Sequence, residues 1–232
     1  MIDKIKQRVF ELLKNDNSGH GIDHINRVLS LSLKFCEKEN ADAEIVSLIA
    51  LLHDVDDYKL FGIEQSETLM NARRIMDECN VDIEIKNRVL EEIKCIGYSK
   101  SLKGIRPNTI EGKIVSDADM CDALGANGIL RVYTYTMKHN KPFFDRNIFP
   151  IEDITALEYT RKSSDSSVCH FFEKILKLKD MMLTESGREE AISRHTIVVD
   201  FLYHLFEEEN AKEWTEYLND YLEKRKIKNR KV

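Results

Sequence analysis

Residues 48–54 have the sequence LIALLHD, in which a dense apolar run ends in a histidine and an aspartate that are adjacent in the chain. An apolar run of this kind is typical of a helix that is buried on every side. The polar pair at its end needs bonding partners, because an unpaired charge in a protein core is costly. A bound metal ion would satisfy both side chains, and a hydrogen-bonded core histidine is the simpler alternative.

The chain has 232 residues, which is enough for one domain with a sizeable core. Lys and Arg together number 35 and Asp and Glu number 41, so the formal net charge is −6. An acidic protein is not expected to bind nucleic acid through its overall charge, and the basic segment 224–231 is only a weak candidate for such a contact. A small anion could still bind in a local basic pocket. The sequence gives no indication of the oligomeric state.

Cysteine usage and the absence of long apolar segments predict a cytoplasmic protein with no membrane partner. The cysteines are far apart in the chain and form no CxxC motif, so we expect them to be small core residues in a reducing compartment. Residues 1–6 are too charged for a signal peptide, and no run of 18 apolar residues occurs. The cysteines are Cys36, Cys79, Cys95, Cys121 and Cys169.

The sequence predicts an all-α fold. Pro occurs three times and Gly nine times, and period-2 alternation of apolar residues is hard to find. Helices are expected over residues 3–14, 22–39, 42–53, 64–78, 83–96, from 108 through 119, and over 168–183, 187–209 and 210–226. Loops are expected over residues 98–108 and 139–152.

The predicted N-terminal caps are residues whose side chains can accept hydrogen bonds from the first backbone N–H groups of a helix. Asp42 and Asp82 precede two of the predicted helices. Asn108 and Ser186 are each followed three residues later by a glutamate, as in a capping box.

Four polar side chains that lie beside apolar, core-facing residues form a candidate metal site. His24, His53, Asp54 and Asp119 each lie in a predicted helix or at its end, beside residues that point into the core. Imidazole nitrogens and carboxylate oxygens together suit Mn²⁺, Fe²⁺, Co²⁺, Ni²⁺ or Mg²⁺ better than a thiolate site would. A divalent ion held by four protein ligands leaves positions for water or substrate.

The order His24, His53-Asp54, Asp119 resembles the H…HD…D signature of the HD-domain metal-dependent phosphohydrolases. Further segments are similar to the small single-domain bacterial members, which include manganese-dependent nucleotide pyrophosphohydrolases. These segments are GHGIDHINRV (19–28), LLHDVDDYK (51–59), EGKIVSDAD (111–119), DALGA (122–126) and HFFEK (170–174). The resemblance implies a single-domain HD-type helical bundle over residues 1–206, with extra C-terminal helices. Residues 207–232 are expected to be a C-terminal helix and a basic tail on the same domain.

The resemblance also implies roles for individual residues. His24, His53, Asp54 and Asp119 would bind the metal, with Asp54 also counted as catalytic because it contacts the reacting centre. Asp57 occupies the place where related enzymes often carry a glutamate that bonds to the attacking water, so it is the candidate general base. Its side chain is one methylene shorter than that glutamate.

A polyphosphate needs cations around it, and five residues are candidates for that contact. They are His20, Arg27, Lys59, Lys113 and Lys174, of which His20 lies between two glycines and Lys174 lies in one of the resembling segments. The remaining histidines, including His170, His195 and His204, are expected to serve the core or the surface.

The predicted function is hydrolysis of a (deoxy)nucleoside triphosphate to monophosphate and pyrophosphate by a metal-activated water. One divalent ion is expected, with Mn²⁺ favoured and Fe²⁺, Co²⁺, Ni²⁺ and Mg²⁺ left open. The alternatives are a nucleotide phosphomonoesterase, a cyclic-nucleotide phosphodiesterase, or a non-enzymatic metal-dependent nucleotide sensor. The substrate is therefore a nucleotide or another phosphorylated small molecule. No Walker A sequence, HExxH motif or complete dinucleotide-binding glycine motif competes with this interpretation.

Overall fold

A computed structural model describes residues 1–16, 21–152 and 164–229, without the side chains of Lys59, Lys228 and Asn229. The elements are α1 (Ile2–Leu13), α2 (Ile22–Glu39), α3 (Ala43–Leu52), α4 (Tyr58–Phe61), α5 (Ile63–Thr68), α6 (Met70–Glu78), α7 (Ile83–Ile93), α8 (Tyr98–Leu102), α9 (Ile110–Asp122), α10 (Gly125–Lys138), α12 (Ser167–Glu173), the 3-10 helix η1 (Ile175–Met181), α13 (Glu185–Glu208) and α14 (Lys212–Asn229). These residues contain no β-strand, which confirms the predicted all-α fold.

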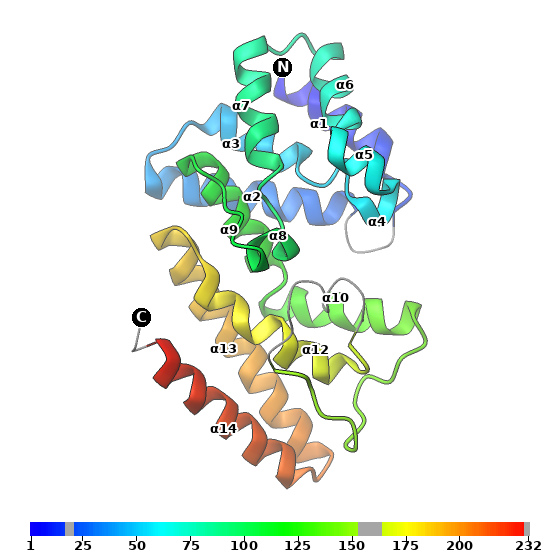
Figure 1. Cartoon of the computed structure of the whole chain (residues 1–232), viewed down its shortest axis with the longest axis vertical. Coiled ribbons are helices and arrows are strands. Elements are labelled where there is room, and N and C mark those ends of the chain that lie inside the picture. Colours follow the sequence, from blue (N-terminus) through cyan, green and yellow to red (C-terminus); the bar gives the residue numbers. More distant parts are fainter. Residues whose placement is uncertain (17–20, 153–163, 230–232) are drawn as a thin grey trace.

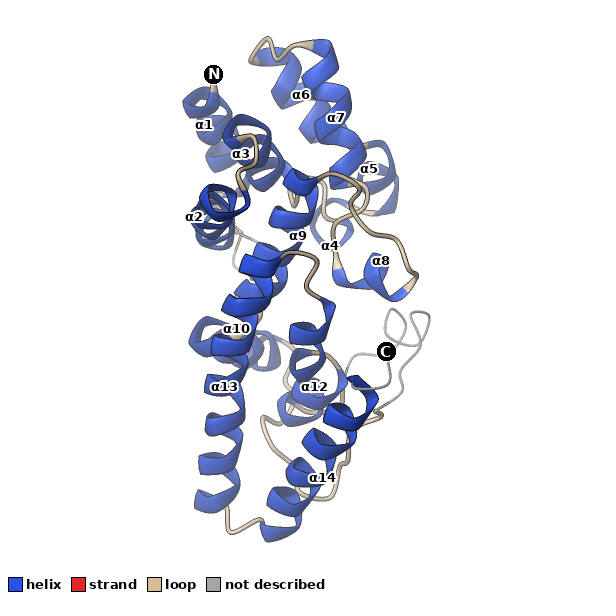
Figure 2. Ribbon diagram, turned by 90° about the vertical axis from the view of Figure 1, so that its left-hand side faces the viewer, coloured by secondary structure: helices blue, strands red, loops and turns tan. Residues whose placement is uncertain are grey.

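The molecule is elongated, with α1 to α9 at one end and α10 to α14 at the other (Figures 1 and 2). Helix α3 lies in the centre of the first end, where it packs against α2, α9, α1 and α7. Every side chain of α3 from Ile45 to Leu52 is buried, as the apolar run predicts. The side chain of Asp42 caps this helix by accepting hydrogen bonds from Glu44 N (2.9 Å) and Ile45 N (3.2 Å), which confirms that cap.

The predicted single helix over 64–78 is wrong, because the chain breaks at Leu69 into α5 and α6. Leu69 has a left-handed backbone with φ 54. The cause lies in the buried Asp56, whose carboxylate accepts hydrogen bonds from the backbone N–H groups of Asn71 and Ala72, both at 2.9 Å. These bonds fix the first turn of a new helix to the segment that follows α3, so α6 cannot continue the axis of α5.

The predicted loop over 98–108 contains the short helix α8. Gly97 and Gly104 flank it with φ values of +126 and +78, a backbone region that L-residues with side chains rarely adopt. Helix α7 ends at Ile93, earlier than predicted. Its predicted cap is confirmed, because Asp82 accepts a hydrogen bond from Glu84 N at 2.8 Å. The turn at Gly97 therefore starts a separate element instead of ending the previous one.

Two predicted caps are displaced by one or two residues. Helix α9 is capped by Thr109, whose hydroxyl accepts from Gly112 N at 3.2 Å. The N–H of Asn108 donates instead to the buried Glu92. Helix α13 is capped by Thr184 in the same manner. The predicted cap Ser186 is used elsewhere, because its hydroxyl and its N–H both donate to Glu39.

The second end of the molecule is built on α13 and α14. The predicted helix over 168–183 is divided into α12 and η1, and residues 139–152 form the predicted loop. Trp214 of α14 is fully buried and stacks on Phe149 with ring centroids 4.6 Å apart. The boundary at residue 206, between the predicted HD-type core and the C-terminal helix and tail, stays a prediction. No helix in the described ranges combines the length and apolar character needed to cross a membrane.

Candidate metal centre and adjoining cavity

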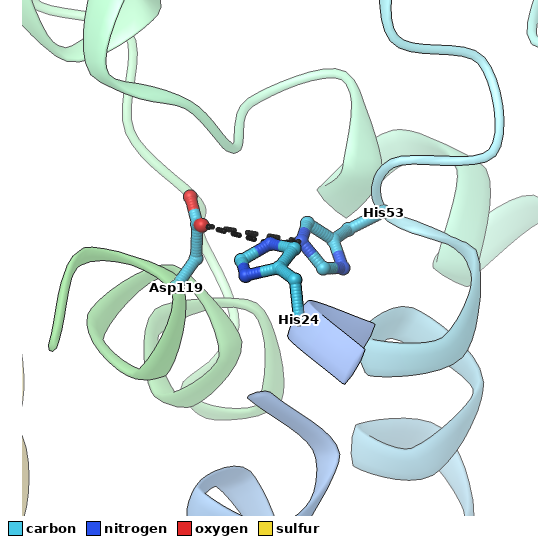
Figure 3. Close-up of side chains that lie close together, drawn as sticks. All are labelled: His24, His53 and Asp119. Carbon is cyan, nitrogen blue, oxygen red and sulfur yellow. Dashed lines mark hydrogen bonds and ion pairs between the residues drawn. The ribbon is translucent and has the colours of Figure 1, made fainter. Parts of the chain in front are cut away.

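Four side chains from three helices converge on one point. His24 lies in the first turn of α2, His53 and Asp54 follow α3, and Asp119 lies in α9. The Nε2 atom of His24 lies 3.3 Å from His53 Nε2, 3.3 Å from Asp54 Oδ2 and 3.5 Å from Asp119 Oδ1. Figure 3 shows both rings and the carboxylate of Asp119 directed towards each other.

This donor set fits a divalent metal ion. His53 Nε2 also lies 3.7 Å from Asp54 Oδ1 and 4.0 Å from Asp119 Oδ1, so two nitrogens and two carboxylates face a common centre. Ligand atoms at about 2.1 Å from one octahedral ion are separated by about 3 Å, which is close to these spacings. Mixed imidazole and carboxylate ligands are typical of Mn²⁺, Fe²⁺ and related ions.

The other nitrogen of each ring has its own partner. The Nδ1–H of His53 donates to the carbonyl of Ala50 at 2.8 Å, and the Nδ1–H of His24 donates to Asp122 Oδ2 at 2.8 Å. A histidine whose Nδ1–H is bonded in this way presents the lone pair of Nε2 to a metal. Both rings therefore direct Nε2 towards the common centre.

His24 and Asp122 each shift the pKa of the other. Burial lowers the pKa of His24, but its hydrogen bonds to Asp122 and Asp54 outweigh burial and raise the pKa to about 9. Burial raises the pKa of the Asp122 carboxyl, but the bonds from His24 and Arg27 and the charge of Arg131 hold that pKa well below its usual range. Asp122 is consequently ionised at neutral pH.

A cavity adjoins the metal centre. Its lining includes the candidate ligands His53, Asp54 and Asp119, and it continues to three cationic side chains, which are Lys100, Arg131 and Lys174. Burial lowers the pKa of Lys100 and lowers that of Lys174 to about 8, with the charge of Asp119 acting in the opposite direction on Lys174. An acidic centre thus continues into a basic wall.

The structure places the sequence-predicted residues at different distances from this cavity. Asp57 and Lys174 line it. Arg27 does not, because its guanidinium donates to Asp122 from Nε at 2.7 Å and from Nη2 at 3.0 Å. Lys113 is also absent from the lining. His20 and the side chain of Lys59 lie outside the described residues.

Sequence reasoning missed Asp122, Lys100 and Arg131. One signal could have found Asp122, since it follows Asp119 by three residues and therefore lies on the same side of a helix. His24 and Arg27 have the same spacing on α2, so two i,i+3 pairs face each other across the site. Lys100 and Arg131 lie far from the motif in sequence, and no spacing rule connects them with it.

Asp117 has a different role, although it lies in the same helix and is also buried. Its carboxylate accepts hydrogen bonds from Leu183 N at 2.9 Å and from the N–H and hydroxyl of Thr184 at 2.8 and 2.7 Å. Burial raises its pKa to about 6. Asp117 therefore holds the start of α13 and does not contribute to the metal centre.

Comparison with known proteins agrees with this geometry. The family model for the HD domain matches residues 21–124. The protein YpgQ of Bacillus subtilis (strain 168), described as uncharacterized, is 32% identical over 207 residues, which are 88% of this chain and 91% of YpgQ.

Solved structures are similar over nearly the whole chain. A structure from Lactobacillus plantarum matches with a TM-score of 0.76 and 29% identity, covering 93% of this chain and 97% of that one. An HD-superfamily hydrolase from Bacillus thuringiensis matches with a TM-score of 0.70 and 33% identity, covering 90% and 97%. B. subtilis YpgQ in complex with ADP matches with a TM-score of 0.69 and 30% identity, also covering 90% and 97%. With the HD-domain model matching residues 21–124 and an HD-superfamily hydrolase 33% identical over 90% of it, this chain belongs to the HD-domain superfamily of hydrolases.

Proposed function

We propose that this protein is a metal-dependent phosphohydrolase that splits a nucleoside triphosphate, ribo or deoxy, into monophosphate and pyrophosphate. The observation that carries the proposal is the junction between the cluster of His24, His53, Asp54 and Asp119 and a cavity wall with three cations. A polyphosphate bound there would meet a divalent ion at the phosphorus that reacts and positive side chains at its other phosphates. The ADP complex of YpgQ supports a nucleotide as the ligand.

His24, His53, Asp54 and Asp119 would hold one divalent ion, for which we propose Mn²⁺. When bound, such an ion lowers the pKa of a coordinated water and withdraws charge from a phosphoryl oxygen. The protein contributes the fixed positions of the donor atoms, which burial and the Nδ1 hydrogen bonds of both rings maintain.

Asp57 is the proposed general base. Its backbone N–H donates to the carbonyl of the ligand Asp54 at 3.1 Å, and its own carbonyl accepts from Leu60 N at 3.0 Å. The residue is therefore fixed in a turn between the ligands and α4, and it lines the cavity. From this place its carboxylate would accept the proton of the attacking water and direct a lone pair towards phosphorus.

Lys100, Arg131 and Lys174 are the proposed phosphate-binding residues. Lys100 and Lys174 come from α8 and from the end of α12, and Arg131 comes from α10, so both ends of the molecule contribute to the wall. His20, Lys59 and Lys113 stay as further proposals for phosphate contact. Of these, only the Lys113 side chain lies in the described part, and it is outside the cavity lining.

The proposal is tested by supplying a panel of nucleotides with Mn²⁺ and resolving the products by anion-exchange chromatography. Equimolar monophosphate and pyrophosphate are expected from a triphosphate. Orthophosphate would indicate a phosphomonoesterase, opening of a cyclic nucleotide would indicate a phosphodiesterase, and tight binding without turnover would indicate a sensor. The His53→Ala/Asp54→Ala double variant should lose both metal and turnover, and full metal occupancy in it would refute the ligand assignment.

A further inference from the structure

Asp122 is a buried carboxylate with an unusual number of charged partners. Its Oδ2 accepts from His24 Nδ1 (2.8 Å), from Arg27 Nη2 (3.0 Å) and from Arg131 Nη1 (2.8 Å), while Oδ1 accepts from Arg27 Nε at 2.7 Å. The residue is only 1% exposed. Three helices, α2, α9 and α10, thus meet at one carboxylate.

A buried charge of this kind needs compensation, and two arginines and the His24 ring supply it. Whole buried ion pairs can often be replaced by apolar packing without loss of stability, so the joining of helices does not by itself explain this one. Here one of the bonded atoms is the ring nitrogen of a metal ligand, which gives the carboxylate an additional task. We propose that Asp122 is the positioning residue of the metal site, fixing the His24 ring with Nε2 towards the ion, and that Arg27 and Arg131 hold Asp122 in place.

The physical reason is the symmetry of the imidazole ring. A half turn of the ring about the Cβ–Cγ bond exchanges Nδ1 with Cδ2 and Nε2 with Cε1. Only one of the two ring orientations therefore directs Nε2 towards His53, Asp54 and Asp119. The bond from Nδ1–H to Asp122 selects that orientation and keeps the proton on Nδ1. Outer partners of metal-bound histidines contribute about 10–100-fold to metal affinity.

The two arginines hold Asp122 in different ways. Arg27 forms two parallel hydrogen bonds, a geometry that a lysine cannot reproduce. Arg131 forms one bond, so a lysine can replace that single contact, and Arg131 also lines the cavity. Arg27 is expected from the sequence to bind phosphate. In this proposal it instead holds Asp122, which in turn orients the His24 ring.

The test is titration of the full chain with Mn²⁺ in the absence of nucleotide, with thermal stability measured on the same samples. Asp122→Asn should raise the Kd for Mn²⁺ by about 10–100-fold. Asp117→Asn is the matched control, because it makes the same change in the same helix at an equally buried residue, which bonds to Leu183 and Thr184 just before α13 and not to His24. It should lower the melting temperature and leave the Kd for Mn²⁺ unchanged.

The arginines provide a second measurement that does not depend on the folding of Asp122→Asn. Arg27→Lys should raise the Kd for Mn²⁺ several-fold, whereas Arg131→Lys should leave it near the wild-type value. A wild-type Kd in Asp122→Asn, or equal weakening in Asp122→Asn and Asp117→Asn, would overturn the inference. Equal behaviour of the two arginine variants would overturn the division of their roles.

This inference rests on the metal site of the proposed function and not on its substrate, and the two can fail separately. If the wild-type chain binds Mn²⁺ but splits no nucleotide, only the proposed function fails. If it binds Mn²⁺ and Asp122→Asn binds it equally well, only the positioning role fails.

Discussion

The ammonium of Lys174 lies 5.0 Å from the centroid of the Tyr98 ring, over its face. Tyr98 begins α8 and Lys174 follows α12, so this cation–π contact joins the two ends of the molecule across the cavity. Such contacts hold a lysine in place without neutralising it. The contact therefore fixes the position of a cation that lines the cavity.

Replacing Lys174 with Met should weaken substrate binding while metal stays bound. The expected loss is about 1–3 kcal/mol, the scale of a hydrogen bond to a charged group, which is roughly a 5- to 150-fold rise in KM. Steady-state kinetics with a nucleoside triphosphate measures it. Lys138→Met is the matched control, because Lys138 is exposed at the end of α10 and outside the cavity lining. An equal rise in both variants would place the phosphates elsewhere.

The same lysine predicts a pH dependence. Burial lowers the pKa of Lys174 to about 8, so its charge is present below that pH and is lost as the pH rises through it. Substrate affinity of the wild type should therefore decline above about pH 8. The Lys174→Met variant should lack this part of the decline, and identical profiles for the two proteins would contradict the assignment.

Asp57→Asn should separate binding from turnover. The amide keeps the shape of the side chain but cannot accept a proton, so metal content and nucleotide affinity should survive. The chemical step should slow by roughly 10²–10⁴-fold, the usual share of general acid–base catalysis. Single-turnover kinetics, metal analysis and a binding titration measure the three quantities on one preparation.

Two outcomes would revise the role of Asp57. Turnover near the wild-type rate would reduce it to a turn residue between the ligands and α4. Loss of the metal would add it to the ligand set. Asp57→Glu tests the length of the side chain, because it adds the one methylene by which Asp57 falls short of the glutamate that the resemblance leads us to expect.

His195 makes the fold sensitive to acid. Its ring is buried in α13, Nε2 has no hydrogen-bond partner among the described residues, and burial, assisted by the charge of Lys179, lowers its pKa to about 4. Asp180 and Arg225 also face it. In the unfolded chain a histidine has a pKa of about 6.5. Between these values the unfolded state binds a proton that the folded state excludes.

Stability should consequently fall as the pH decreases from about 6.5 to 4, and His195 should account for up to about 3 kcal/mol of that loss. His195→Gln cannot take up the proton and should lose less stability over this range. Urea unfolding at several pH values measures the difference. His204→Gln, at an exposed position of the same helix, should follow the wild type.

Gly187 leaves room for the carboxylate of Asp117. A Cβ atom at this position would lie 2.3 Å from Asp117 Oδ2 and 2.7 Å from Asp117 Cβ. Gly187→Ala should therefore displace Asp117 and lower the free energy of unfolding by about 1–3 kcal/mol. At Gly62, a Cβ would meet nothing within 4 Å, so Gly62→Ala reports only the strain of its φ of +88 and involves no displaced side chain.

Much of the fold could be predicted because its signals are local. Helix α2 has the predicted bounds, and Asp42 and Asp82 cap the helices that follow them. The resemblance to HD-domain proteins placed His24, His53 and Asp119 together, although they come from three helices. In each case a few neighbouring residues, or a motif already known, contained the information.

The unpredicted features depend on contacts between distant residues. The break at Leu69 is imposed by Asp56, and nothing near Leu69 in the sequence indicates a turn. The partners of Asp122 on α2 are 95 and 98 residues away, so Arg27 could be interpreted from sequence only as a free cation. Local sequence patterns cannot show which distant side chain will pair with a given charged residue.

Helix α9 carries Asp117, Asp119 and Asp122 within two turns: Asp117 is bonded to the start of α13, whereas Asp119 and Asp122 face opposite nitrogens of the His24 ring. One residue added between Asp117 and Asp119 would rotate everything after it by about 100° relative to the start of α13. The metal ligand and the partner of His24 would then both leave the site. Most side chains of α9 are buried, so this helix can accept no change in length, and insertions and deletions should be confined to the segments between helices.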